Sequence, residues 1–363
     1  MADIMDRKNI IIAGLAVVFA AACTKAPAEE QAGEENISGT AIPVSLEVSI
    51  GTEDPETRLT YELDGEGTAL KSTWEKGDQI SLITYDQNGR MMKNDVLTAE
   101  SSGTSVKFIG TYSGSAEAGN SKRTGISIIY PALSGDPLAS PAEPGWWNAY
   151  YTSGPYYIAD KFLALPETRK FIQPGDGSLT YLPYYTLMCG SVTDLDNFLE
   201  TGKFTTTLYH YTYIIKAELT LPSTHPDGES DYNITSVKID FPQSWKPFMY
   251  YGIFNFGTGD FKDTYNTNAL QTYLGKITSD GEVMGIYCPR SSKVTVYFVG
   301  GFRRPDIQFN FNTDSPWTIT AYYIDGNLEE KTLTATKTIK SGINMYSGNM
   351  YTMSAELEKV IEY

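Results

Sequence analysis

Few residues in this chain belong to the types that most often carry out catalysis or bind metals. Its 363 residues include only two histidines, His210 and His225, and three cysteines. Neither histidine belongs to an HExxH motif, no GxSxG motif occurs, and no serine or aspartate pattern marks a catalytic triad. We therefore assign no catalytic residue, no metal ligand and no cofactor, and we expect a protein that is not an enzyme. A hydrolase that uses surface carboxylates is an alternative, since paired carboxylates cannot be identified in one sequence this acidic.

Acidic residues outnumber basic ones. The chain has 44 aspartates and glutamates against 28 lysines and arginines, which gives a formal net charge of −16 and a pI near 4.6. Such a charge is repelled by the phosphate backbone of nucleic acids, so we expect no nucleic-acid partner. The acidic segments 64–67 and 194–197 lack the ligand spacing of a calcium-binding loop, and we interpret both as acidic turns.

The N-terminus has the pattern of an export signal. An apolar run of thirteen residues, 10–22, is too short to span a membrane, which takes about 20 residues, and is typical of a signal peptide. The run ends in three alanines followed by Cys23, which resembles a bacterial lipobox. We predict a lipoprotein signal peptide over 1–22, acylation of Cys23, as by palmitate, and a polar tether over 23–40. A plain secretory signal that is cut before Cys23 is the alternative.

The two other cysteines, Cys189 and Cys288, each lie in an apolar run. An extracytoplasmic compartment permits a disulfide between them, but an even pair of cysteines alone does not predict one. We expect two buried, unpaired thiols.

The body of the chain is predicted to consist of β-strands. The first of them has the clearest pattern, because apolar and polar residues alternate without error from residue 44 to residue 50. This period of two is typical of a half-buried strand, whose apolar face carries Val44, Leu46, Val48 and Ile50. The longest alternating run extends from Tyr209 to Leu221.

No segment shows a long amphipathic helix, and the many short strands favour β-sandwiches. At about 150 residues per domain, the length predicts two of them. We place an N-terminal β-sandwich domain over 41–202 and a C-terminal β-sandwich domain over 203–363.

One segment concentrates aromatic residues beside glycine and proline. It contains Trp146, Trp147, Tyr150 and Tyr151, followed closely by two more tyrosines. Exposed rings of this kind form platforms that stack on sugars or contact proteins. The alternative is that the rings fill the core of a sandwich.

Several different short motifs follow one another along the chain. After the lipobox and the tether they are Glu56-Thr57-Arg58, Trp74-x-x-Gly77-Asp78-x-Ile80, Phe108-x-Gly110, Tyr130-Pro131, Ile234 to Ile239, Cys288-Pro289 and Ser347-Gly348-x-Met350-Tyr351-x-Met353. Each motif is weak alone, but the ordered set resembles the fimbrillin family, the two-domain subunits of type V pili in Bacteroidales-type bacteria. The resemblance implies an all-β fold of two tandem transthyretin-like, Greek-key β-sandwiches.

The resemblance also implies an assembly mechanism. In the family, a lipidated precursor is exported and a trypsin-like protease cuts after an arginine that follows the first strand. Here that arginine is Arg58, and Leu59 becomes the new N-terminus; the alternative is that Arg58 merely lies at a strand edge. Loss of the first strand exposes a groove, which a strand of a neighbouring subunit fills by donor-strand exchange. The implied partners are other fimbrillin-type pilus subunits, the maturation protease and the outer membrane, with surface glycans or proteins as further candidates.

One departure from the family pattern concerns the C-terminus. Stalk subunits carry a further stretch that supplies the donor strand, whereas only six residues follow Leu357 here, and a full strand needs about 7–10. We therefore expect an accessory or tip-like subunit at the cell surface. The alternative is a surface lipoprotein that does not polymerise and binds glycans through its aromatic segment.

Overall fold

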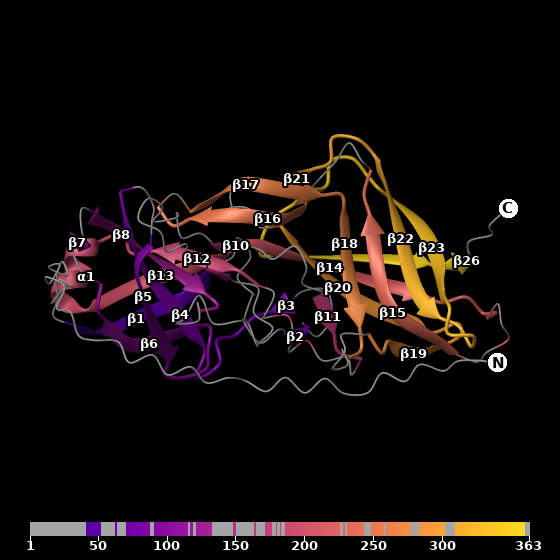
Figure 1. Ribbon diagram of the computed structural model, residues 1–363, viewed down its shortest axis with the longest axis horizontal. Coiled ribbons are helices and arrows are strands. Elements are labelled where there is room, and N and C mark those ends of the chain that lie inside the picture. The colour runs from indigo at the N-terminus through magenta and orange to yellow at the C-terminus, as the bar shows by residue number, and fades with distance from the viewer. Residues whose placement is uncertain are drawn as a thin grey trace, which may run out of the picture. The chain divides into compact units, whose positions relative to one another are not determined.

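A computed structural model gives the structure of the chain (Figure 1). Every described residue belongs to one compact unit, residues 37–363. The structure describes residues 41–51, 62–63, 70–87, 91–114, 117–118, 121–132, 148–149, 163–164, 171–175, 179, 182, 186–225, 228, 231–242, 248–257, 259–276, 283–301 and 309–359. Within them, no helix has the length and apolar character that a membrane span requires.

The N-terminal part of the fold is one eight-stranded sheet. Its order is β12-β13-β1-β6-β5-β4-β8-β7, and β12 pairs with β8 as well as with β13, so the sheet closes on itself. Closure leaves none of the seven strands in the ring with a free edge. The strands are β1 (Ile42–Gly51), β4 (Gln79–Asp86), β5 (Met91–Ala99), β6 (Ser105–Tyr112), β7 (Glu117–Ala118), β8 (Ser121–Tyr130), β12 (Met188–Ser191) and β13 (Lys203–His210).

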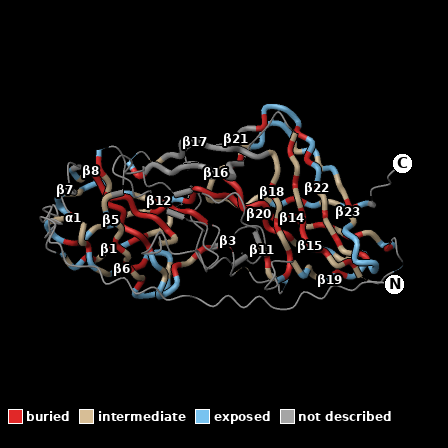
Figure 2. The backbone as a smooth tube through the Cα atoms, viewed as in Figure 1, coloured by how far each residue is buried: buried red, intermediate tan, exposed pale blue. Residues whose placement is uncertain are grey.

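The closed sheet encloses one hydrophobic cluster. Trp74 lies at its centre, fully buried, with its ring 4.9 Å from Phe108 and 5.3 Å from Tyr130 in edge-on contacts. Such edge-to-face pairs stabilise a core beyond the area they bury. In Figure 2, buried residues are concentrated in the strands and exposed residues in the turns between them.

The C-terminal part of the fold is a sandwich of two sheets. One has the order β11-β18-β15-β22-β23-β26, with β19 also paired to β15; the other has the order β20-β14-β25. The strands are β11 (Phe171–Gln173), β14 (Thr212–Thr220), β15 (Asp231–Asp240), β18 (Ala269–Leu274), β19 (Ile286–Pro289), β20 (Lys293–Gly301), β22 (Ser315–Ile324), β23 (Glu330–Ile339), β25 (Met350–Glu356) and β26 (Glu358–Lys359).

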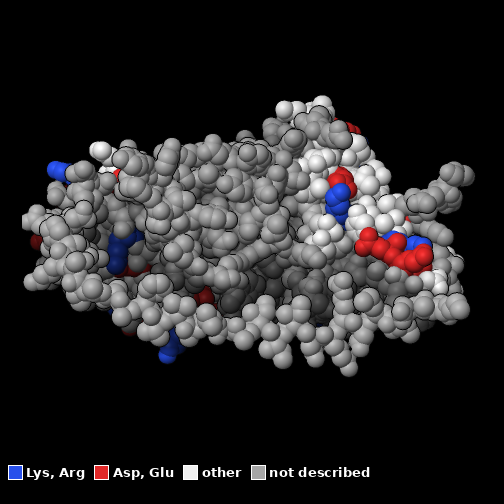
Figure 3. Space-filling view, in the orientation of Figure 1, with Lys and Arg blue, Asp and Glu red and all other residues white. Residues whose placement is uncertain are grey.

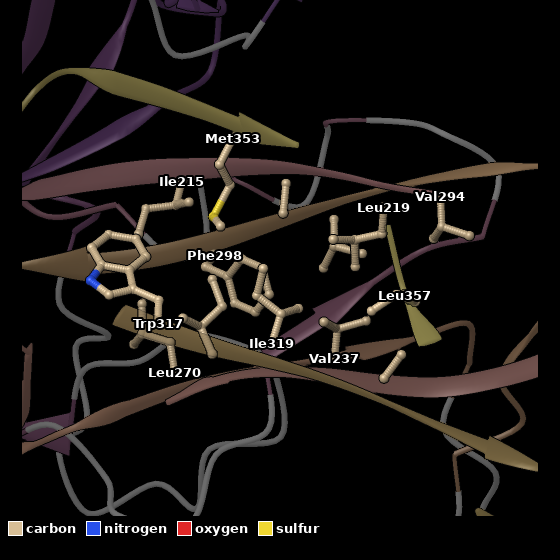
Figure 4. Close-up of a cluster of buried hydrophobic side chains, with 14 of the residues drawn as sticks. Ile215, Leu219, Val237, Leu270, Val294, Phe298, Trp317, Ile319, Met353 and Leu357 are labelled. Atoms are coloured by element: carbon tan, nitrogen blue, oxygen red, sulfur yellow. The ribbon is translucent and has the colours of Figure 1, made fainter. Parts of the chain in front are cut away.

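Both sheets of this sandwich contribute to a second hydrophobic cluster. In Figure 4, Phe298 of β20 and Met353 of β25 lie opposite Trp317 and Ile319 of β22, and Leu357 closes the cluster at one end. The outer face of the larger sheet carries little charge among its described residues. Lys238 and Asp240 of β15 form an ion pair, with nitrogen and oxygen 2.8 Å apart. Figure 3 shows one face of the molecule, on which the described charged side chains lie in a few small groups.

The remaining elements are short or peripheral. They are β2 (Glu62–Leu63) paired with β3 (Leu70–Lys71), β21 (Phe309–Asn310) paired with β24 (Asn344–Met345), a sheet of β17 (Asp260–Thr267), β16 (Phe248–Asn255), β10 (Leu163–Ala164) and β9 (Asn148–Ala149), and one helix, α1 (Leu195–Thr201).

The prediction of an almost entirely β fold is confirmed, whereas transthyretin-like domains stay a prediction. The N-terminal strands form one closed sheet, a feature that alternation cannot reveal because it reports only which face of a strand is buried. The long alternating run is in fact two strands, β13 and β14, which belong to different sheets. The two hydrophobic clusters accordingly divide between Leu208 and Tyr213, while the predicted domain limits stay untested.

The acidic segment 194–197 is not only a turn. Asp194 caps α1, because its Oδ1 accepts a hydrogen bond from the Asn197 N–H at 3.1 Å. This correction concerns local structure only. Segment 64–67 lies outside the described residues.

Candidate functional site

The first strand, β1, lies between two neighbours along almost its whole length. It pairs in parallel with β13, from Ser45 opposite Lys203 to Gly51 opposite Tyr209. On its other side it pairs in antiparallel with β6, from Ile42 opposite Tyr112 to Ser49 opposite Ser105. We call the space that β1 occupies between β13 and β6 the β1 slot.

The strands that border the β1 slot have few other backbone partners. β6 pairs with β5 only through Ile109 and Phe108, and β13 pairs with β12 only through His210 and Tyr209. The three strands β13, β1 and β6 thus form one layer of the closed sheet, joined to the other layer at two narrow corners. Because β1 is the middle strand of this layer, it supplies most of the ladder pairing of both neighbours.

The apolar row of β1 faces the core as the alternation predicts. Val44 is 4% exposed, Leu46 and Val48 are fully buried, and Ile50 at the end of the row is half-buried. Burial of an aliphatic side chain contributes about 1.5–3 kcal/mol, so the three buried residues contribute roughly 4.5–9 kcal/mol before ordering is counted. The slot therefore holds an apolar strand strongly.

The polar row of β1 faces outward. Glu47 is exposed, while Ser45 and Ser49 are half-buried. The Ser49 hydroxyl lies 3.0 Å from the Thr207 hydroxyl on β13. One such hydrogen bond at the surface contributes only about 1 kcal/mol, so the backbone and the apolar row fix the strand in place.

The end of α1 is fitted against the start of β1. Gly202 accepts a hydrogen bond at its carbonyl from the Ser45 N–H at 2.8 Å, and its own N–H caps the helix at the Phe198 carbonyl. The φ angle of Gly202 is +66°, and a Cβ added there would lie 2.4 Å from the Pro43 carbonyl oxygen. Only glycine allows both the left-handed backbone and this close approach.

Sequence analysis did not single out Gly202 or α1. A signal for both was present, since Asp194 at the start and Gly202 at the end match the residue preferences of helix caps. The segment was overlooked because seven residues carry too little helical periodicity to outweigh an acidic, turn-like composition.

The Trp74-x-x-Gly77-Asp78 motif forms a turn that supports the core. The φ angle of Gly77 is +97°, its N–H donates to the Ala99 carbonyl, and the Glu75 N–H donates to Asp78 Oδ2 at 2.7 Å. Burial raises the pKa of the Asp78 carboxyl to about 6, helped by the nearby Glu75 carboxylate and opposed by that hydrogen bond. The motif is therefore structural, and it orients Trp74.

The predicted buried and unpaired state of two cysteines is confirmed. Cys189 and Cys288 are both free and buried. Burial raises the pKa of the Cys189 thiol well above its usual value, and burial with a smaller contribution from Asp231 raises the pKa of Cys288 to about 11. Neither thiol is ionised at neutral pH, so neither has the thiolate character that reactive cysteines need.

The two histidines lie apart from each other in the fold. His210, on the core-facing row of β13 after Leu208, is 4% exposed, and burial lowers its pKa to about 4. His225 packs its ring 4.4 Å from Tyr232. Within the described part of the chain, no group of three or more histidine, cysteine, aspartate or glutamate side chains is arranged to hold a metal ion.

The other predicted site residues lie outside the described residues. This applies to the lipidation site Cys23, to the cleavage site Arg58 and Leu59, and to the aromatic residues Trp146, Trp147, Tyr150 and Tyr151. Among the predicted sites, the structure therefore describes only the row Val44, Leu46, Val48 and Ile50, which it brings together on one strand face.

Comparison with known proteins identifies similar structures but no sequence family. No protein-family model and no curated protein matches the chain. A candidate cell adhesion protein from Bacteroides ovatus is 12% identical, with 89% of this chain and 99% of that one covered and a TM-score of 0.42. The fimbrial anchor protein Mfa2 from Porphyromonas gingivalis is 13% identical, with 87% and 91% covered and a TM-score of 0.34.

A candidate cell adhesion protein from Bacteroides eggerthii is 11% identical, with 87% of this chain and 86% of that one covered and a TM-score of 0.38. All three TM-scores are below 0.5, so these alignments do not by themselves define the fold or the function of the chain. Cell adhesion and fimbrial proteins of Bacteroides and Porphyromonas are thus among the solved structures to which this chain is similar.

Proposed function

We propose that the chain is a fimbrillin-like structural and adhesive subunit of a cell-surface fimbria, assembled by exchange of its first strand. The observation that carries the proposal is the place of β1 as the middle strand of the layer β13-β1-β6. β1 follows directly on the predicted tether, and the predicted cleavage site Arg58 follows β1, so one cut separates this strand from the rest of the body.

The geometry of the β1 slot supports replacement by a single strand. Neighbouring strands lie about 4.8 Å apart, so removal of β1 leaves β13 and β6 about 9.6 Å apart. A gap of two strand spacings is filled by one strand. The replacement offers two rows of backbone groups and inward apolar residues, as β1 does with Leu46 and Val48. An empty slot leaves apolar core exposed and both neighbours poorly paired, which favours rapid refilling.

The remaining parts of the proposal rest on the sequence. Acylation of Cys23 places the precursor at the outer membrane, and a trypsin-like protease cuts between Arg58 and Leu59. Other pilus subunits supply the incoming strand. The accessory or tip position within the fimbria is part of the same proposal.

A disulfide lock tests the proposal. Glu47 of β1 lies directly opposite Lys107 of β6, and opposed Cα atoms in antiparallel strands are about 4.5–5.5 Å apart, within reach of a disulfide. We would prepare the variant Glu47→Cys/Lys107→Cys with Cys23→Ser, in oxidised and reduced form. The native Cys189 and Cys288 are buried and do not compete.

The readout is uptake of a biotinylated peptide with the sequence of residues 41–51 after limited trypsin digestion. We expect a new N-terminus at Leu59, uptake by the cut reduced protein, and none by the uncut protein or the cut oxidised one. The single variant Glu47→Cys with Cys23→Ser serves as the unlocked control. Equal uptake by cut and uncut protein, or no uptake after complete cleavage at Arg58, would contradict the proposal.

A further inference from the structure

The two corners of the C-terminal sandwich differ. At the corner beside β20, side chains cap the outer edge of that strand. Gln173 donates from Nε2 to the Thr295 carbonyl at 2.7 Å and accepts from the Tyr297 N–H at 2.9 Å. Thr272 donates its hydroxyl to the Tyr297 carbonyl at 2.8 Å. Backbone groups that face outward from β20 are thus satisfied, and this corner is sealed.

The opposite corner, beside β25, is open. β25 pairs in parallel with β14 and, among the described residues, with no strand on its other side. The Ile214 N–H donates to the Asn349 carbonyl at one end of the pair, and the Leu357 N–H donates to the Thr220 carbonyl at the other. Backbone groups of a paired strand alternate in direction. The odd-numbered residues of β25 therefore face β14, and the backbone groups of Met350, Thr352, Ser354 and Glu356 face the open corner.

A groove runs along this open corner. It has a volume of about 810 Å³ and is lined by residues 354–356 of β25 and residues 334–337 of β23, together with Glu218, Thr220, Lys293 and Glu358. Ala335 and Ala355, two small residues that pack against the hydrophobic cluster, are part of its lining. We call this space the β25 groove. Proteins usually protect an edge strand from further pairing with a lysine, a proline or a bulge. β25 contains none of these.

A lysine of β23 faces the same groove without a partner. Lys337 pairs in register with the buried Trp317, so it lies on the core-facing row of β23 between Ala335 and Ile339. Among the described residues, no carboxylate forms an ion pair with it. The other lysine on this row, Lys331, does have partners, since its amine lies 3.8 Å from Asp325.

We propose that the β25 groove binds an extended segment of another protein chain as an added strand. The segment runs antiparallel to β25, with small apolar side chains toward Ala335 and Ala355 and one carboxylate toward Lys337. We choose the antiparallel direction by analogy with the N-terminal layer. There, β1 pairs in parallel with β13 on one side and in antiparallel with β6 on the other. The source is a different protein chain, and a second copy of this chain is an outcome that the test distinguishes.

A pair of synthetic peptides tests the proposal on the full chain with its β1 in place. The first alternates threonine with valine over nine residues and carries one glutamate in the valine row; the second has lysine instead of that glutamate. We expect the first to bind and to slow hydrogen exchange at the amides of Thr352, Ser354 and Glu356, measured by NMR. The second should bind roughly fivefold more weakly.

Two variants localise the binding. Ser354→Pro removes an N–H that β14 does not use, so the sandwich should keep its fold while peptide affinity falls roughly tenfold. Ser354→Thr is the matched control and should bind normally, and Thr352→Pro should repeat the loss. Lys337→Met should abolish the difference between the two peptides, whereas Lys293→Met, a lysine on the other side of the groove, should preserve it.

Four results would overturn the proposal. They are failure of both peptides to bind folded protein, normal binding to folded Ser354→Pro, protection of the same amides by concentration-dependent dimerisation, and binding that requires prior removal of residues 360–363. The last two results would identify a second copy or the chain's own end as the occupant. None of these measurements depends on cleavage at Arg58 or on exchange of β1, so the outcome is separate from that of the proposed function.

Discussion

The two halves of the molecule each contain a parallel pair of strands, but the pairs are completed differently. In the N-terminal half, β1 lies parallel to β13 and is flanked on its other side by β6. In the C-terminal half, β25 lies parallel to β14 and no described strand flanks its other side. The same local arrangement thus gives a filled slot in one half and an open groove in the other.

The comparison shows that the burial of a strand's side chains and the pairing of its backbone groups are two separate properties. β1 buries Val44, Leu46 and Val48 of its apolar row and uses both rows of backbone groups, so it leaves only if something replaces it. β25 buries Met353, but no described strand pairs with the row of backbone groups on its other side. Removal of a strand is thus the process expected at β1, and addition of a strand is the one expected at β25.

The largest expected effect compares the cores behind the two strands. Leu46→Ala should lower the free energy of unfolding by about 3–5 kcal/mol, because Leu46 is fully buried between two paired strands and its cavity cannot collapse. Met353→Ala should lower it by about 2 kcal/mol, since Met353 is 7% exposed beside the open corner, where neighbours can adjust. Urea unfolding followed by circular dichroism measures both, and an equal loss would contradict the distinction drawn here.

Acid should act on the N-terminal half through His210. Because burial lowers its folded pKa to about 4 from the usual 6.5, the unfolded state binds the proton first, and stability is lost as pH falls from 6.5 to 4. The loss should reach up to about 3 kcal/mol. Asp78 has the opposite sign, because its raised pKa of about 6 favours the folded state at low pH.

The pH comparison therefore uses an Asp78→Asn background with and without His210→Gln. Urea unfolding at a series of pH values should show a flatter profile for the double variant, and hydrogen exchange at pH 4.5 should rise in β13 before it rises in β14. Parallel pH profiles for the two proteins would show that His210 is not responsible.

Glycine replacements test how closely β1 is fitted to its slot. Gly202→Ala should lower stability by about 2 kcal/mol, since the new Cβ lies 2.4 Å from the Pro43 carbonyl in a left-handed backbone. Gly342→Ala is the matched control: its φ angle is +86° and a Cβ meets nothing within 4 Å, so only the backbone term of about 1 kcal/mol remains. Thermal unfolding measures both losses, and a smaller loss at Gly202 would contradict the close fit.

The smallest effect concerns the open corner. Lys337→Met should raise stability by about 0.5–1 kcal/mol, because an inward lysine without a carboxylate gains from replacement by an apolar side chain of similar length. Glu47→Ala on the outer row of β1 should change stability by less than about 0.5 kcal/mol. Unfolding in urea compares the two, and destabilisation by Lys337→Met would show that the lysine already has a partner.

Much of the β1 site could be predicted from the sequence, and the β25 groove could not. The alternation from Val44 to Ile50 predicted both the strand and its buried row, because a strand with one face in a core must alternate. β23 was not recognised as a strand, since its row Leu333, Ala335, Lys337 is interrupted by a charge. The groove depends on that strand and on the lack of a described strand on the outer side of β25, and no residue type encodes which strands are neighbours.

One alternating run of residues suggested a single continuous strand where the structure has two strands. Tyr209 and Tyr213 fit a single period of two, yet Tyr209 is 46% exposed and Tyr213 is buried, because the chain passes from one sheet to another between them. Periodicity continues smoothly across such a crossing, while the environment on each side changes completely.

The amino-acid sequence alone was enough to establish the β class and the inward row of the first strand, and to favour two buried, unpaired cysteines. The closure of the N-terminal sheet, the place of β1 between β13 and β6, and the lack of a described strand beside one edge of β25 became known only from the folded structure. The physical reason is that inward rows are set by side chains, which differ from residue to residue. Strand order is set by backbone groups, which are alike in nearly every residue and acquire partners only when the whole chain is folded.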